Sequence, residues 1–397
     1  MGPHGRRGHA RVVARVATLL LLTPLLTVTD IPGSTPPAAA TPVTVGNCEV
    51  DVTRSDGNPL PDGAIGPTGS HVRVKTPSGT ADCVLEFVQE DFEMVWTFPS
   101  HLSEFEALIV GGGGAGNSGG GGAGGLYDTY EGTNTAPDVH TDAIEIPTAA
   151  IQARIFVGDG ATAGETGTNQ FTQDGDGQSS GIIFDTYPGT ASNLFGSTDG
   201  GSSGCSAGGF LEVSADAVVM PGGGSGSGWS SFRGCSGGSG AGGSEDYSGG
   251  SAATVRSLTF GNRGGTGDEL GGGPEGSSGG GGGAGSAGGN GTSTAGKGGS
   301  GVSSSITGQQ KVYAAGGGGA FQEGGSETGR ASGIGGRGDS KFQSRANGVE
   351  ETGSGGGGAF QSFGEEKRQL GNGGSGVVVV RFAPPPVEPA PVLGSVI

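Results

Sequence analysis

Three glycines, Gly111, Gly113 and Gly116, have the spacing of a dinucleotide-binding turn. They follow the apolar run 107–110, which predicts a buried strand, and Glu131 lies where such a fold places its ribose-binding acid. The chemistry requires a helix after the turn, because the pyrophosphate binds at the helix N-terminus. The residues that follow are mostly glycine, and each glycine costs a helix about 1 kcal/mol relative to alanine. The sequence therefore argues against a nucleotide site.

Other catalytic motifs also occur without their required context. Ser206 and Ser236 each lie in a G-x-S-x-G pentapeptide, but a hydrolase elbow needs a preceding strand, a following helix and a histidine partner. A phosphate-loop spacing ends at Lys297, where Gly298 replaces the Ser or Thr that binds magnesium. Chance matching in a sequence rich in glycine and serine explains these motifs. We expect no catalytic residues and no cofactor, so the chain is predicted not to be an enzyme.

Metal and recognition motifs are equally isolated. Asp174 and Asp176 lack further acidic ligands at EF-hand spacing, and the segment 264–270 is one residue short of a calcium-binding nonapeptide that works by repetition. An incidental Ca²⁺ site at these acidic residues is one interpretation, and solvated turns are the preferred one. We therefore predict no metal site. The integrin-type tetrapeptide 337–340 is common by chance in this composition.

Four cysteines form two well-separated pairs, and three pairings are formally possible. Local pairing of Cys48 with Cys83 and of Cys205 with Cys235 is preferred, because each pair brackets its own stretch of chain. Each disulfide would close a loop of about 30 residues and contribute roughly 3–4 kcal/mol. A metal site is the alternative, but the C-x-x-C spacing is missing.

The first 40 residues have the pattern of a secretory signal peptide. Four arginines precede the apolar run 16–28, and 38–40 offer an A-x-A cleavage site. About 13 apolar residues are too few to span a bilayer, and no later segment is long enough, so no transmembrane segment is expected after cleavage. The formal net charge of −18 disfavours nucleic acid as a partner. The chain is predicted to be secreted or associated with the cell surface.

Segments with the pattern of β-strands lie before and after the glycine-rich region 111–376. Residues 41–92 have ordinary composition and predict a small, disulfide-stapled β-module. Further strands are expected at 105–110, 153–157 and 377–382, and residues 384–397 form a proline-rich tail.

Glycine makes up 94 of the 397 residues and close to one residue in three between 111 and 376. The strict period and high proline content of collagen are missing. Apolar pairs and triplets recur through the region, so we expect order rather than a flexible linker. Glycine chains can pack side by side as extended three-residue helices, with N–H···O bonds between bare backbones. The sequence thus predicts a polyglycine II bundle standing on a β-core.

The residues that carry these features resemble a known family. The segments WTFP (96–99), FEALIVGGGGAG, RIFVGDG and GGSGVVVVRF together resemble the glycine-rich domain of bacterial and phage proteins, and are similar to the extracellular glycine-rich domain of anaplastic lymphoma kinase receptors. The resemblance covers residues 93–383. It implies a mainly β fold, with a β-sandwich-like core and an inserted polyglycine II helix bundle, in surface proteins and adhesins. No recognition residues carry over.

The expected function is therefore non-catalytic adhesion or extracellular scaffolding by a secreted, acidic bacterial protein. Its partner would be a cell-surface glycan or protein, and the oligomeric state stays open. One alternative is a protein that binds ice or carbohydrate surfaces, and a less favoured one is an exported hydrolase. Five aromatic residues in the glycine-rich loops could contact a partner or could pack together as a minor core, and we favour the minor core. They are Trp229, Phe232, Phe321, Phe342 and Phe360.

Overall fold

The computed structural model describes a mainly β protein whose named elements are all strands. The predicted signal peptide lies outside the described residues, as does the tail beyond 386. No helix in the described ranges is both long and apolar enough to cross a membrane. The ranges are 42–88, 92–130, 142–163, 175–188, 211–227, 233–244, 246–255, 258–269, 276–321, 333–339, 346–359 and 369–386.

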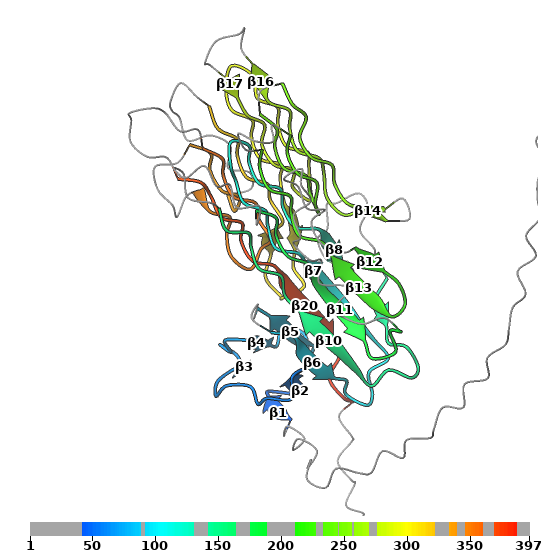
Figure 1. The fold of residues 1–397 in the computed structure, drawn as a ribbon. Helices are drawn as coiled ribbons and strands as arrows, with labels where there is room; N and C mark the ends of the chain where they lie inside the picture. The colour runs from blue at the N-terminus through cyan, green and yellow to red at the C-terminus, as the bar shows by residue number, and fades with distance from the viewer. Residues whose placement is uncertain are drawn as a thin grey trace, which may run out of the picture. The chain divides into compact units, whose positions relative to one another are not determined.

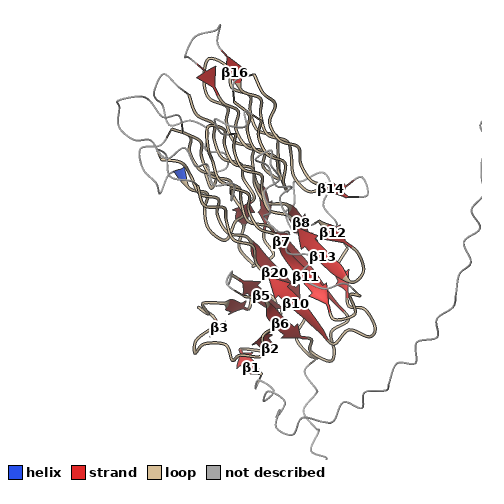
Figure 2. Ribbon diagram, viewed as in Figure 1, coloured by secondary structure: helices blue, strands red, loops and turns tan. Residues whose placement is uncertain are grey.

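Two large sheets contain most of the strands (Figures 1 and 2). In order, the first sheet contains β1 (Val43–Val45), β2 (Cys48–Arg54), β6 (Met94–Thr97), β10 (Gln152–Phe156), β11 (Ser180–Phe184), β13 (Ala217–Met220) and β12 (Glu212–Val213). The second contains β3 (Ile65–Gly66), β4 (Val72–Lys75), β5 (Cys83–Phe87), β20 (Val377–Phe382), β7 (Glu104–Val110) and β8 (Leu126–Asp128), and β9 (Ile144–Glu145) also pairs with β7. Neighbouring strands are antiparallel apart from β3 and β4.

One hydrophobic core receives side chains from both sheets, as a β-sandwich requires. Trp96 of β6 is fully buried in it. Its ring centroid lies 5.0 Å from that of Phe98, 5.3 Å from that of Phe105 and 5.6 Å from that of Phe382. Aromatic pairs at these separations add to the hydrophobic stabilisation.

The valine run of β20 is explained by burial on both faces. Successive side chains of a strand point to opposite sides of its sheet. Val378 and Val380 join the shared core, whereas Val377 and Val379 join a second cluster on the outer face of the sheet. The predicted strands 105–110 and 377–382 are confirmed as β7 and β20, which pair directly with each other.

The N-terminal strands are divided between the two sheets. Residues 42–88 contribute β1 and β2 to the first sheet and β3, β4 and β5 to the second. Cys48 on β2 and Cys83 on β5 form the predicted disulfide, with their Cα atoms 5.5 Å apart. The stretch predicted as a module of its own thus shares both sheets with strands from the glycine-rich region, and the disulfide links the sheets.

Between Gly111 and Gly376, most described residues outside these sheets belong to no strand, yet many are buried. Three short hairpins occur among them. They are formed by β14 (Thr254–Val255) with β15 (Leu258–Thr259), β16 (Asp268–Glu269) with β17 (Gly276–Ser277), and β18 (Val302–Ser304) with β19 (Lys311–Tyr313).

Candidate functional site

The glycine segment 119–125, called the central segment below, donates its backbone hydrogen bonds in a regular order. Successive amides bond to three different segments in turn, and the order repeats after three residues. Donor–acceptor distances lie between 2.8 and 3.3 Å. The acceptors are the carbonyls of Ser227, Gly279, Gly356, Gly224, Gly282, Gly353 and Pro221, for donors 119 to 125 respectively.

The carbonyls of the central segment accept from three further segments. Gly122 accepts from Gly114, Gly121 from Gly317, and Gly120 from Gly242. Six different neighbouring segments are thus bonded to one extended chain.

The same order recurs in segment 279–284. Its amides reach three partners in turn and return to the first after three residues, with acceptors Gly243, Gly289, Gly317, Gly240, Ser286 and Ala314. The amides of these buried glycines are therefore satisfied by bonds to other segments of the chain, most of them distant in sequence, rather than by a sheet or helix.

Neighbouring segments touch backbone to backbone. A Cβ on Gly121 would lie 2.1 Å from the carbonyl oxygen of Gly114, and one on Gly317 would lie 1.9 Å from that of Gly356. Real Cβ atoms essentially never approach another atom within 3.0 Å. These positions therefore require glycine, because a Cβ would occupy the space of a neighbouring carbonyl oxygen. This requirement accounts for the high glycine content of the region.

The glycines of the nucleotide-like motif are used for this packing. The amides of Gly111, Gly113 and Gly116 donate to the carbonyls of Gly125, Gly374 and Gly371, at 3.0, 2.8 and 2.8 Å. No helix occurs in the described residues 117–130 that follow them. These amides are not available to a phosphate, because each is already bonded.

Residues of three other motifs from the sequence analysis are hydrogen-bonded to backbone amides of the protein. The Ser236 hydroxyl accepts from the Ser251 amide at 3.1 Å, and Asp176 accepts from the Ser225 amide at 2.6 Å. Asp339 of the integrin-type tetrapeptide is only 1% exposed, and its carboxylate accepts from the Phe321 amide at 2.5 Å. In the ranges that the structure describes, no cluster of three His, Cys, Asp or Glu side chains could hold a metal ion.

Several predicted residues lie outside the described ranges. Cys205 is one of them, so its pairing with Cys235 stays a prediction. Of the five aromatic residues considered for partner contact, Phe321 alone is described, and it is partly buried beside Asp339. Trp229, Phe232, Phe342 and Phe360 fall in the remaining segments.

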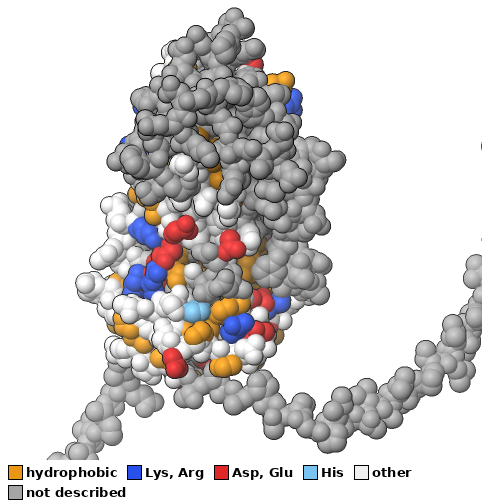
Figure 3. Space-filling view, turned by 60° about the vertical axis from the view of Figure 1, so that its left-hand side comes forward, with side chains coloured by type: hydrophobic (Ala, Val, Ile, Leu, Met, Phe, Trp, Pro, Cys, Tyr) orange, Lys and Arg blue, Asp and Glu red, His pale blue; other side chains and the backbone are white. Residues whose placement is uncertain are grey.

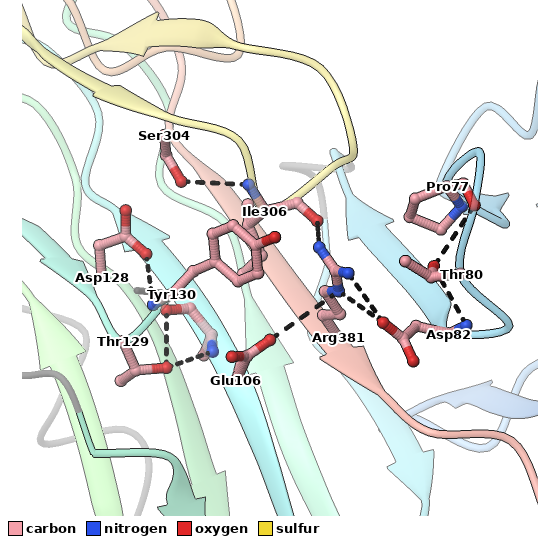
Figure 4. A network of polar contacts seen from close by, with 11 residues as sticks. Pro77, Thr80, Asp82, Glu106, Asp128, Thr129, Tyr130, Ser304, Ile306 and Arg381 are labelled. Atoms are coloured by element: carbon pink, nitrogen blue, oxygen red, sulfur yellow. Dashed lines mark hydrogen bonds and ion pairs between the residues drawn. The ribbon is translucent and has the colours of Figure 1, made fainter. Parts of the chain in front are cut away.

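A polar network that the motifs did not reveal lies on the outer face of the second sheet (Figure 4). Arg381 of β20 is 7% exposed and bonds Asp82 through Nη2 at 2.7 Å. Its guanidinium stacks over the Tyr130 ring, 4.6 Å from the centroid, and its Nε lies 3.8 Å from Glu106. The Ile306 carbonyl accepts from Nη1 at 3.4 Å, so the network joins the sheet to the loop between β18 and β19.

A second group of charges lies on β4, β5 and a turn of the glycine-rich region. Arg73 makes a two-pronged ion pair with Glu351, with both contacts at 2.5 Å. Lys75 bonds the buried Glu86 at 2.7 Å. The Lys311 ammonium of β19 donates to the Glu351 carbonyl at 3.1 Å. Figure 3 shows acidic and basic side chains intermixed on one face of the described surface, so this surface offers no large field of one sign.

Replacement of Glu351 by Gln is expected to lower the free energy of unfolding by about 1 kcal/mol, because it removes one charged two-pronged contact at a partly exposed site. The Arg73 guanidinium lowers the pKa of Glu351. A lowered pKa stabilises the folded state above the ordinary pKa of glutamate, and this stabilisation is lost as the pH falls through the folded value. Urea unfolding at pH 7 and pH 3 checks the prediction: the difference between Glu351→Gln and wild type should shrink at pH 3. An equal difference at both values would contradict it.

Comparison with known proteins identifies one family. The sequence model of a family described as a glycine-rich domain matches residues 89–383. No curated protein and no solved structure matches the chain.

Proposed function

Because the chain belongs to the glycine-rich domain family, we propose that it is a non-catalytic, secreted or cell-surface protein acting in adhesion or as an extracellular scaffold. In this proposal the glycine segments form a polyglycine II helix bundle, and the bundle is the rigid body of the scaffold. The observation that carries the proposal is the three-residue repeat of hydrogen-bond partners along the central segment.

The repeat supports a polyglycine II bundle for a geometric reason. A chain of this type has three residues per turn and no internal hydrogen bonds, so successive amides point in three directions around its axis. A β-strand would alternate between two sides of a sheet instead. Segments 119–125 and 279–284 both follow the three-fold order.

Close backbone packing also supports a mechanical role. The dense network of hydrogen bonds between segments leaves the buried glycines little freedom, although glycine loses the most conformational entropy on ordering. The two large sheets and the Cys48–Cys83 disulfide offset part of that loss. A stiff body of this kind suits the display of loops to a glycan or protein on another surface.

A binding array of surface glycans and intact cells tests the proposed function. The purified protein beginning at residue 42 should bind a subset of these surfaces saturably, and a Gly121→Ala variant should bind them more weakly because its glycine-rich region is destabilised. Hydrolytic turnover of array substrates by the purified protein would contradict the non-catalytic proposal. Secretion is tested separately, by N-terminal sequencing of the protein recovered from the culture medium, which should begin near residue 41.

A further inference from the structure

Three neighbouring glycine segments lie at the surface of the glycine-rich region. They are 262–267, 287–291 and 296–300, called the outer segments below, and each contains exposed residues, whereas the central segment is buried throughout. Hydrogen bonds from the middle one reach both of the others: Gly288 donates to the Arg263 carbonyl at 3.0 Å and Gly289 to the Lys297 carbonyl at 2.7 Å. The outer segments therefore form one bonded layer.

Each outer segment carries a side chain at every third position. The pattern is X-Gly-Gly-X, where X is not glycine. A chain with three residues per turn directs every third residue to the same side, and here that side faces solvent, because every X is exposed or partly exposed. The X residues, called the outward residues below, are Arg263 and Thr266, Ala287 and Asn290, and Lys297 and Ser300.

The amides of the outward residues donate to no backbone carbonyl in the described part of the chain. Two of them donate to side chains instead: the Thr266 amide to Asn290 Oδ1 at 2.9 Å, and the Ser300 amide to Ser286 Oγ at 2.9 Å. By contrast, backbone carbonyls accept from five of the six glycines between the outward residues, which are Gly264, Gly265, Gly288, Gly289 and Gly299. The direction that leads to a third neighbouring segment in the central segment thus leads here to solvent or to a side chain.

An outward Cβ keeps a further chain away from these amides. Inner segments touch backbone to backbone, and a Cβ on Gly121 would lie 2.1 Å from the Gly114 carbonyl oxygen. At an outward residue the Cβ is present, so the backbone of another chain cannot come equally close. Unpaired backbone groups at the edge of a hydrogen-bonded structure are otherwise a template for another chain, and proteins often protect such edges with charged side chains. Arg263 and Lys297 are the charged outward residues.

We propose that the outward residues stop a second copy of this chain from adding its own glycine segments to the outer segments. The inference rests on the polyglycine II bundle of the proposed function, and it identifies what ends that bundle on this side. Glycine at the outward positions would leave backbone amides open in the direction in which inner segments bond to one another. Two copies would then pair backbone to backbone through this layer.

Sedimentation velocity of the protein from residue 42 tests the proposal. The variant combines Ala287→Gly, Asn290→Gly and Lys297→Gly, which removes the Cβ from neighbouring outward positions of two outer segments. It should form larger species than wild type at the same concentration, with a sedimentation coefficient that rises as the concentration rises. Near-ultraviolet circular dichroism establishes that the variant is folded.

Asn290→Ala with Lys297→Ala is the matched control. It removes the same amide side chain and the same charge, but a Cβ stays at every outward position, including Ala287. It should therefore sediment like wild type. A folded glycine variant that sediments like wild type, or an alanine variant that associates as strongly as the glycine variant, would overturn the proposal.

Amide hydrogen exchange of wild type tests the same idea without depending on the fold of a variant. The amides of Asn290 and Lys297 should exchange at least about tenfold faster than those of Gly288, Gly289 and Gly299, after correction for intrinsic rates. Equal protection of the two sets would mean that the outward amides are already bonded to another chain, and would overturn the proposal.

The central segment separates this inference from the proposed function in the same experiment. Protected amides at Gly121 and Gly122 together with protected outward amides would overturn the inference alone, because the bundle would still be present. Exchange of Gly121 and Gly122 at the rate of an unfolded chain would overturn the proposed bundle as well.

Discussion

Replacement of Gly121 by alanine is expected to destabilise the glycine-rich region by about 3 kcal/mol or more, because overpacking of a closed interior forces the backbone to move. The new Cβ would lie 2.1 Å from the Gly114 carbonyl oxygen. Moving the chain away would stretch the bonds from Gly121 to Gly356 and from Gly317 to Gly121, which are 2.8 and 2.9 Å long. The free energy of unfolding from urea denaturation, followed by near-ultraviolet circular dichroism, measures the effect.

Gly289→Ala is the matched control. It lies in the same region, but the atoms nearest to its added Cβ are the backbone nitrogen and oxygen of Lys297, at 3.1 and 3.2 Å. A shift of a few tenths of an ångström accommodates that contact, so the expected loss is below about 1 kcal/mol. Equal stability of Gly121→Ala and Gly289→Ala would show that the central segment is not closely packed.

Loss of the Cys48–Cys83 disulfide is expected to lower the free energy of unfolding by about 4 kcal/mol. The two cysteines are 35 residues apart in sequence, and the bond restricts the unfolded chain over that loop. It also joins β2 of one sheet to β5 of the other. A Cys48→Ala, Cys83→Ala double variant should therefore unfold at a clearly lower urea concentration than the oxidised wild type.

Reduction of the wild-type protein provides the comparison for that variant. The reduced wild type and the reduced double variant should unfold within about 1 kcal/mol of each other, because under reducing conditions neither contains a disulfide. Oxidised wild type and double variant with the same unfolding midpoint would contradict the stabilising role of the disulfide.

Strand positions were predictable from the sequence because their signals are local. The apolar runs 105–110 and 377–382 are β7 and β20, and residues 153–157 overlap β10. Glycine-rich composition likewise indicated close backbone approach, which the space around Gly121 bears out. Each of these inferences needs only side-chain type and spacing along a short stretch.

Strand pairing was not predictable in the same way. Nothing near β5 indicates that its partner is β20, about three-quarters of the chain length away, where Glu86 lies opposite Val379. The same limitation hides the outer-face network. Arg381, Asp82 and Glu351 are ordinary charged residues in sequence, and topology alone brings them onto one face.

The order of hydrogen-bond partners along the central segment could not be predicted from the sequence either, because the segment consists almost entirely of glycine. Any register of glycine against glycine has the same composition. The choice depends on where strands such as β7 enter the region and on which residues flank each segment.

Scalar couplings across hydrogen bonds, measured by nuclear magnetic resonance on the protein from residue 42, test the three-fold bundle most directly. The amides of Gly121, Gly122 and Ala123 should couple to the carbonyl carbons of Gly356, Gly224 and Gly282, which belong to three different segments. Gly124 should return to the first partner segment, through Gly353. Couplings that alternate between two partners, or amides that exchange as fast as those of an unfolded chain, would contradict the account.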